Sequence, residues 1–234
     1  MRYLIKYRRR LGDIVACLPA AKHLRDEGHD VWFETDPQFA DIFHCVDYVR
    51  WANPYLDNGG FDRILDLQIH RGGDGGRRYQ EFRSSGRHWI EFVYDNPDIS
   101  AAAWRRPCFT KIDWFDPKRY RLPATGDYAI VGSTGVSQQQ RHDPRAVATL
   151  ASKLYPGAPI VQLSAGPTVD AGFVFCRRLR DLPGLIAHAR HCLLINSGPN
   201  IIAAAVRDSH HLIPQTGPAA QDNMNYGTAI EVRP

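Results

Sequence analysis

The sequence predicts an α/β protein built from two βα domains, each with a parallel sheet. Short apolar runs alternate with helical patterns, as in βαβ units. Polar or glycine-rich loops follow several of these runs, and the alternation restarts after 108–123, a segment without periodicity. We therefore predict domains at 1–123 and 124–234. A chain of 234 residues is long enough for two separate cores.

In the first domain, apolar runs predict four strands, at 3–7, 29–34, 48–51 and 63–68. A period near 3.6 residues predicts a helix over 14–27, ended by Gly28, with a kink or a new start at Pro19. Asp36 and Pro37 open a second helix at 38–43. The aromatic segment 79–94 is predicted to be helical and partly buried.

The second domain repeats this architecture without a visible sequence repeat. Strands are predicted at 128–132, 159–163, 192–195 and 212–214. Helices are predicted at 145–155, with Asp143 and Pro144 as the start signal, at 181–190 and at 200–206.

Composition excludes several classes of protein. The chain has no run of 18 apolar residues, and its first residues do not have the order of a signal peptide. Its five cysteines lack ligand spacing, which indicates a reduced, cytoplasmic protein without a structural metal. The net charge of +4 comes from scattered arginine pairs, which are typical of solvated faces but also of proteins that bind phosphate-bearing ligands.

The stretch 191–206 is the strongest candidate site. A buried strand leads into the turn Asn196 to Pro199 and then into a helix that contains Asn200. Pro199 suits a first helical turn, and Ser197 is a candidate N-cap. Free N–H groups at the start of a helix bind anions, so Asn196, Ser197, Gly198 and Asn200 are candidates for phosphate contact. An ordinary βα connection explains the same pattern.

Two further loops follow strands. Ser133, Thr134 and Gly135 begin a polar loop that reaches Arg141, a candidate for bidentate phosphate contact. The glycine-rich segment 70–78 contains His70 and Asp74 and lacks the ending of a Walker motif. It is either a surface loop or part of an acceptor site.

Motifs in both halves resemble one family. The first half has Arg10, LGDIV at 11–15, LPA at 18–20 and FDRILDLQ at 61–68. The second half has INSGP at 195–199, AAA at 203–205 and TGP at 216–218, followed by NYG at 225–227. In order and spacing these are similar to motifs of glycosyltransferase family 9, the ADP-heptose:lipopolysaccharide heptosyltransferases.

The resemblance implies a GT-B fold, in which two Rossmann-like domains face a cleft. It implies a metal-independent, inverting transfer of sugar from a nucleotide-diphosphate-sugar, without a cofactor, to a hydroxyl of a glycan or lipid-linked glycan. Asp13 matches the family's proposed catalytic aspartate and would be the base, although a helix cap explains it equally from the local sequence. Arg10, Gly12, His70 and Asp74 would lie on the acceptor side.

The chain departs from the family at several positions. It is shorter than a typical member, its motif aspartate is Asn196, its motif histidine is Ile201, and the usual lysine of the second domain is absent. These departures keep two alternatives open: a nucleotide or nucleic-acid binding module on the same fold, and a glycosyltransferase that acts on DNA. The absence of GxGxxG after the first strand disfavours an NAD-dependent enzyme.

Overall fold

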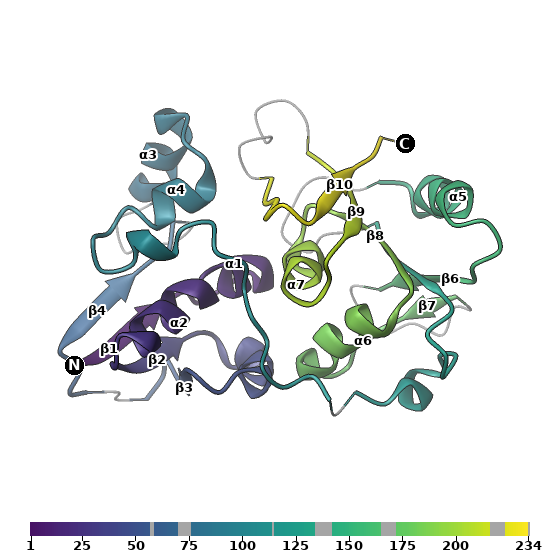
Figure 1. The fold of residues 1–234 in the computed structure, drawn as a ribbon. Coiled ribbons are helices and arrows are strands. Elements are labelled where there is room, and N and C mark those ends of the chain that lie inside the picture. The colour runs from purple at the N-terminus through teal and green to yellow at the C-terminus, as the bar shows by residue number, and fades with distance from the viewer. Residues whose placement is uncertain are drawn as a thin grey trace.

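The computed structural model describes residues 1–56, 59–69, 76–113, 115–133, 142–164, 172–215 and 223–233. They form two parallel sheets, one in each half of the chain, with helices between them (Figure 1). The sheets lie on either side of residue 124, where the sequence predicts the domain boundary.

The first sheet has the strand order β3-β2-β1-β4. Its strands and the helices of this half are β1 (Arg2–Lys6), α1 (Leu11–Ala16), α2 (Leu18–Asp26), β2 (Asp30–Glu34), the 3-10 helix η1 (Pro37–Cys45), β3 (Arg50–Ala52), β4 (Arg63–Asp66), α3 (Arg77–Ser85), α4 (Trp89–Val93) and the 3-10 helices η2 (Ser100–Ala102) and η3 (Pro117–Tyr120). The predicted first helix is thus two helices that meet at Cys17, just before Pro19. The predicted second helix is a 3-10 helix, so that prediction was wrong in type.

The second sheet has the strand order β10-β9-β8-β5-β6-β7. Its elements are β5 (Ala129–Gly132), α5 (Pro144–Leu154), β6 (Ile160–Leu163), β7 (Phe173–Val174), the 3-10 helix η4 (Leu179–Asp181), α6 (Leu182–His188), β8 (His191–Ile195), α7 (Gly198–Val206), β9 (His210–Ile213) and β10 (Ala229–Glu231). All four predicted strands are present. The strands β7 and β10, which are only two and three residues long, were not predicted.

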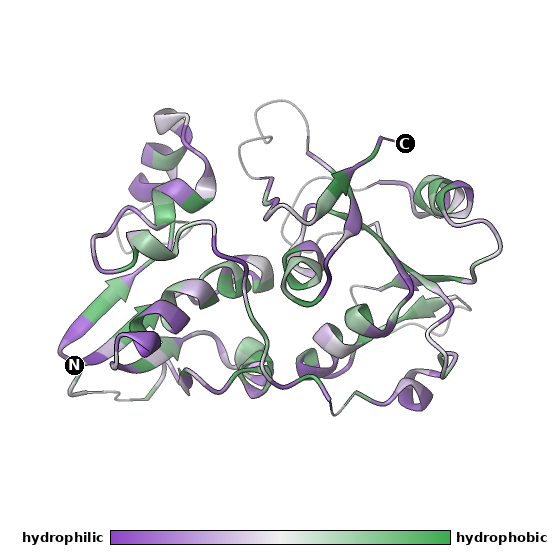
Figure 2. Ribbon diagram, in the orientation of Figure 1, coloured by the Kyte–Doolittle hydropathy of each residue, from purple (hydrophilic) through white to green (hydrophobic). Residues whose placement is uncertain are grey.

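Helices cover both faces of the second sheet. On one face, Val147 and Ala151 of α5 pack in a cluster with Val131 and Leu193. On the other face lie α6 and α7, which separate this sheet from the N-terminal half (Figure 1). Figure 2 shows apolar residues along the strands and on these central helices, while α3 is strongly polar.

The first sheet buries one face under its helices, through residues such as Ile5 and Phe33. The opposite face carries Arg2, whose guanidinium lies over the rings of Trp32 and Phe61, at 5.1 and 4.7 Å from their centroids. Ile64 of β4, whose register partner in β1 is Leu4, is exposed.

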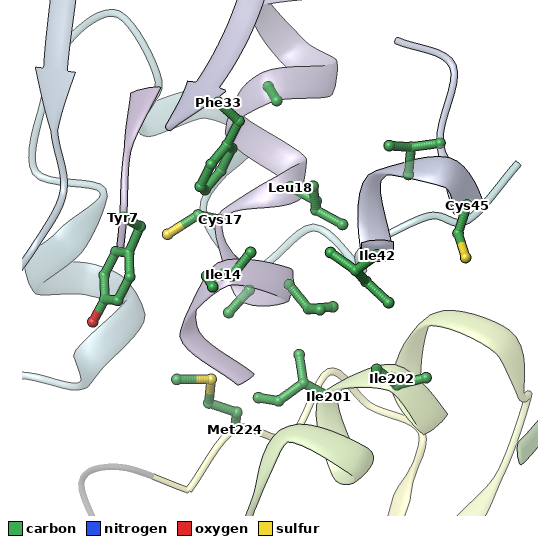
Figure 3. Close-up of a cluster of buried hydrophobic side chains, with 14 of the residues drawn as sticks. Tyr7, Ile14, Cys17, Leu18, Phe33, Ile42, Cys45, Ile201, Ile202 and Met224 are labelled. Atoms are coloured by element: carbon green, nitrogen blue, oxygen red, sulfur yellow. The ribbon is translucent and has the colours of Figure 1, made fainter. Parts of the chain in front are cut away.

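A single apolar cluster joins the two halves. Ile14, Leu18 and Ile42 from the N-terminal half lie near Ile201 and Met224 from the C-terminal half, and all five are buried (Figure 3). Relative domain motion is expected unless the interface is large and hydrophobic, and this interface is part of the core.

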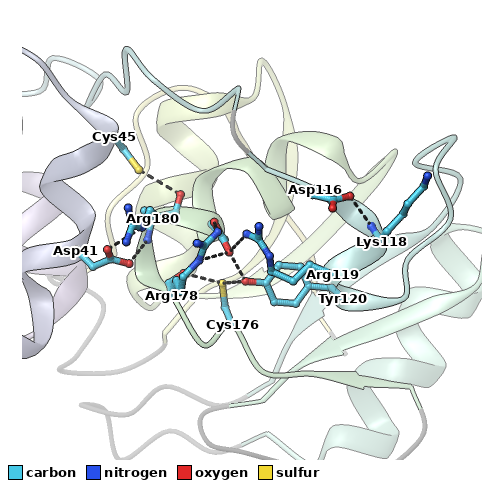
Figure 4. Close-up of polar contacts among 10 residues, drawn as sticks. Asp41, Cys45, Asp116, Lys118, Arg119, Tyr120, Cys176, Arg178 and Arg180 are labelled. Carbon is cyan, nitrogen blue, oxygen red and sulfur yellow. Dashed lines mark hydrogen bonds and ion pairs between the residues drawn. The ribbon is translucent and has the colours of Figure 1, made fainter.

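Polar contacts secure the same junction below the apolar cluster. The Arg180 backbone N–H and its guanidinium contact the two oxygens of Asp41 at 3.0 and 2.9 Å, which joins η4 to η1 (Figure 4). The thiol of Cys45 donates to the Arg180 carbonyl. These contacts hold the end of η1 against the start of α6.

Candidate functional site

Asp13 lies in the first turn of α1 at the junction of the two halves. Its Oδ2 accepts a hydrogen bond of 2.7 Å from the hydroxyl of Tyr7, which follows β1 directly. Tyr7 is buried, and burial followed by the charge of Asp13 holds the pKa of its phenol well above its ordinary value. Tyr7 therefore remains a hydrogen-bond donor and fixes the orientation of the Asp13 carboxylate.

Arg10 precedes α1 and has a backbone φ of 68°, a left-handed conformation that is uncommon for a residue other than glycine. Its carbonyl accepts from the Ile14 N–H, and its positive charge opposes the rise in the pKa of the Tyr7 phenol that burial and Asp13 cause. Arg8 and Arg9 point elsewhere, because they pair with Glu34 and Asp36 at 2.9 and 3.5 Å. Of the three consecutive arginines, Arg10 is thus the one placed near Asp13.

Gly12 and Gly198 bring the two halves into backbone contact. A methyl group placed on Gly12 would lie 3.1 Å from the Cα of Gly198, and one placed on Gly198 would lie 3.2 Å from the nitrogen of Gly12. Both distances are shorter than ordinary van der Waals contact. Since Asp13 follows Gly12, its carboxylate belongs to the same turn that touches the N-terminus of α7.

The turn before α7 is held by a buried amide network. Asn196 Oδ1 accepts from the Met224 N–H at 3.3 Å, and Asn200 Nδ2 donates to the Met224 carbonyl at 3.0 Å. His210 Nε2 donates to Asn200 Oδ1 at 2.7 Å. Burial, followed by the charge of Arg207, lowers the pKa of His210 to about 4, so the ring is neutral at ordinary pH.

Three predicted site residues therefore have structural contacts in this turn. Asn196 and Asn200 are buried, with the contacts given above. Ser197 occupies the N-cap position of α7 as predicted, but its hydroxyl donates to the Ile195 carbonyl and makes no side-chain cap. Pro199 lies in the first turn of α7 as predicted.

The departures from the family motif have a physical explanation in this chain. Ile201, at the motif histidine position, is buried in the junction and would contact a methyl group on Gly12 at 3.6 Å. Asn196, at the motif aspartate position, receives the Met224 N–H described above. Both positions therefore hold the C-terminal segment and α1 in place.

Of the remaining predicted site residues, the structure describes only Ser133. Ser133 follows β5 and is buried, and its carbonyl accepts from the His142 N–H. The other five predicted positions, Thr134, Gly135, Arg141, His70 and Asp74, lie outside the described residues.

The segment from Asn223 to Tyr226 reaches the N-terminal half, which sequence analysis did not anticipate. The Asn223 carbonyl accepts from His88 Nε2 at 2.7 Å. The hydroxyl of Tyr226 is buried and has no hydrogen-bond partner among the described residues. Burial, and then the charges of Cys17 and Asp13, raise the pKa of Tyr226. The sequence singled out this segment only through the run NYG.

Trp89, the first residue of α4, lies on the other side of Tyr7. The two ring centroids are 6.0 Å apart, and the indole nitrogen is buried without a partner among the described residues. Tyr7, which donates to the Asp13 carboxylate, is thus packed against an aromatic side chain of α4.

No group of three or more His, Cys, Asp and Glu side chains in the described ranges could hold a metal ion. None of their helices is long and apolar enough to cross a membrane.

No protein-family profile matches the chain, and no curated protein matches it in sequence. Solved structures of glycosyltransferases share its fold. A family 9 glycosyl transferase from Veillonella parvula DSM 2008 has a TM-score of 0.68 at 13% identity, over 99% of this chain and 85% of that chain. The E. coli ADP-heptose lps heptosyltransferase II has a TM-score of 0.71 at 12% identity, over 100% of this chain and 90% of that chain. The E. coli heptosyltransferase WaaC with ADP has a TM-score of 0.66 at 14% identity, over 100% of this chain and 94% of that chain.

These likenesses confirm the GT-B fold that the motifs predicted. At such low identity they establish the shared fold alone. Because each match covers nearly the whole chain, both halves and their arrangement belong to the fold.

Proposed function

We propose that the protein is a glycosyltransferase that moves a sugar from a nucleotide-diphosphate-sugar to a hydroxyl of a glycan or lipid-linked glycan. The observation that carries the proposal is the orientation of Asp13. Its carboxylate is fixed by Tyr7 in the turn of α1 that touches the N-terminus of α7. This contact supports the proposal that Asp13 is the base and that the N-terminus of α7 binds the donor diphosphate.

The proposed chemistry is a single displacement. Asp13 takes the proton of the acceptor hydroxyl, and the oxygen attacks the anomeric carbon of the donor. The bond from that carbon to the diphosphate breaks, and the diphosphate leaves with the bonding electron pair. Attack opposite the leaving group inverts the anomeric configuration. No metal and no cofactor takes part in this proposal.

The leaving diphosphate carries the negative charge that develops in the reaction. We assign it to the backbone N–H groups of the turn at Ser197 and Gly198, where a helix N-terminus favours anions. Thr134, Gly135 and Arg141 are proposed to complete the donor side, and Arg10, His70 and Asp74 the acceptor side. Four further residues are proposed to hold these groups in place, namely Asn196, Asn200, Gly12 and Ser133.

The first experiment is a thermal-shift screen without metal, against ADP-, UDP-, GDP-, CMP- and dTDP-sugars, NAD and duplex DNA. A ligand that binds only the folded state raises the midpoint with its occupancy. We expect one class of nucleotide-sugar to stabilise the protein. A shift with duplex DNA and with no nucleotide-sugar would contradict the proposal and favour the nucleic-acid alternative.

The second experiment tests the base with the donor identified by the screen. Asp13→Asn is expected to lower turnover about 10²- to 10⁴-fold, the range for removal of a general base, and to keep the donor-induced shift. Asp26→Asn is the matched control, because this exposed carboxylate pairs with Lys22 on α2. Unchanged turnover in a folded Asp13→Asn variant would refute Asp13 as the base.

A further inference from the structure

Trp104 is a large aromatic residue that the fold holds at the surface in a strained conformation. Its side chain is exposed, with a residue exposure of 41%, and its backbone φ is 61°. A bulky residue in the left-handed region is a genuine outlier, and such strain persists only where the surroundings enforce it. The segment of Trp104 is therefore held in place by its neighbours.

His88 supplies one of these constraints. Its Nδ1 accepts from the Ile90 N–H at 3.1 Å, and its Nε2 donates to the Asn223 carbonyl at 2.7 Å. With both nitrogens engaged, the imidazole plane is fixed between α4 and the C-terminal segment. The Trp104 ring lies against this plane, with 4.4 Å between the ring centroids and an interplanar angle of 40°.

Arg106 supplies the second constraint. Its Nε donates to the Ala204 carbonyl at 2.8 Å, and its Nη2 donates to the Arg207 carbonyl at 2.6 Å. These bonds tie the segment that carries Trp104 to the C-terminal end of α7. The indole is therefore mounted on a rigid frame with contacts to both halves of the protein.

Trp104 and the Tyr7–Asp13 pair lie in the same half of the protein and have contacts with successive residues at the start of α4. The Trp104 ring lies against His88, and the ring of the next residue, Trp89, lies 6.0 Å from that of Tyr7, which donates to Asp13. Tyr7 and Trp89 are buried, whereas Trp104 is exposed. A ligand at Trp104 would therefore lie beside the C-terminal segment that His88 contacts.

We propose that Trp104, backed by His88, is a stacking platform for a sugar ring of the acceptor. This inference rests on the proposed function and adds a binding residue to it. A sugar ring has one apolar face of C–H groups and a rim of hydroxyls, which matches a single exposed indole among polar neighbours. Arg105 and Arg106 flank Trp104 and are exposed, so the surface is not the contiguous apolar patch that a protein partner needs.

The test measures glycan binding on a glycan array of bacterial and mammalian oligosaccharides. Wild type is compared with Trp104→Ala, Trp104→Phe and Trp104→Gly. Trp104→Gly also relieves the backbone strain and so protects the test against a folding defect. The matched control is Trp32→Ala, because Trp32 is a partly exposed tryptophan on the far face of the first sheet, under Arg2 and Arg50.

We expect Trp104→Ala and Trp104→Gly to weaken binding of the recognised glycans about tenfold, which corresponds to about 1.4 kcal/mol. Trp104→Phe should retain most of the binding, and Trp32→Ala all of it. Equal binding by wild type and Trp104→Gly, equal loss in Trp32→Ala, or no glycan bound by wild type would each overturn the platform. The nucleotide-sugar thermal shift is measured on the same variants. If that shift is absent in wild type, the proposed function fails, whereas a normal shift with unaltered glycan binding refutes the platform alone.

Discussion

Asp181 is a buried charge that connects the segment 108–123 to the C-terminal half. Its carboxylate is fully buried and accepts from Arg119 at 2.9 Å, from two nitrogens of Arg178 at 2.9 and 3.0 Å, and from the Tyr120 hydroxyl at 2.6 Å (Figure 4). We predict that Asp181→Asn, which keeps the volume and removes the charge, strongly destabilises the protein.

The magnitude follows from the exposure of the partners. Breaking a buried ion pair costs about 3–5 kcal/mol when the remaining charge stays buried. Here the side chains of Arg119 and Arg178 are 43% and 40% exposed, so they can regain water when the carboxylate is lost. The Tyr120 hydroxyl loses an ionised acceptor, and a hydrogen bond to a charged group contributes about 1.5–3 kcal/mol. We therefore expect a loss of about 2–4 kcal/mol.

Urea denaturation measures the loss as a lower midpoint at unchanged slope. Asp127→Asn is the matched control, since Asp127 pairs with Arg190 at 3.5 Å and both side chains are more than half exposed. That variant should change stability by less than about 1 kcal/mol. A loss below about 1 kcal/mol for Asp181→Asn would refute the reasoning, because the buried carboxylate would then contribute no more than an exposed one.

Two further predictions concern the junction and the buried histidine His210. Gly12→Ala should destabilise the protein by about 1–3 kcal/mol, because the added methyl group meets the backbone of Gly198. In an open helix the same substitution raises stability, so a higher denaturation midpoint would contradict the close contact. Stability should also fall as pH decreases from 6.5 through 4, because His210 is held neutral with its pKa lowered from 6.5 to about 4 and must bind a proton on unfolding. At about 1.4 kcal/mol per pKa unit, the full loss of stability is about 3 kcal/mol. His210→Gln should therefore flatten the pH dependence of the denaturation midpoint. An equal pH dependence in that variant would show that His210 is not the group responsible.

Local patterns in the sequence were sufficient to predict most elements. A strand such as Ala129–Gly132 is buried on both faces and therefore reads as a continuous apolar run. The helix Pro144–Leu154 begins where predicted, because Asp143 accepts from the Arg145 N–H beside a first-turn proline. The short strand Phe173–Val174 was missed, since two residues carry no periodic signal.

The candidate site depended on the tertiary structure to a larger degree. The sequence identified Asp13 and the turn before α7 through motifs, and it offered Gly12 and Gly198 as contacts for a ligand. Only the packing of α1 on α7 shows that these glycines permit the two backbones to touch. No local pattern encodes that contact, because the two residues lie far apart in the chain and each glycine alone is equally consistent with a turn.

The sequence by itself predicted the two-sheet architecture and most of its strands and helices, because these depend on local periodicity, and its short motifs singled out Asp13 as a candidate. The tertiary structure alone decided which side chains orient Asp13 and pack beside it. Tyr7 donates to Asp13 and packs against Trp89, and both belong to the apolar cluster that joins the two halves. The same packing fixes His88 against the Asn223 carbonyl and leaves Trp104 exposed beside it. Contacts between distant segments follow from burial of the whole chain, which single-segment patterns do not encode.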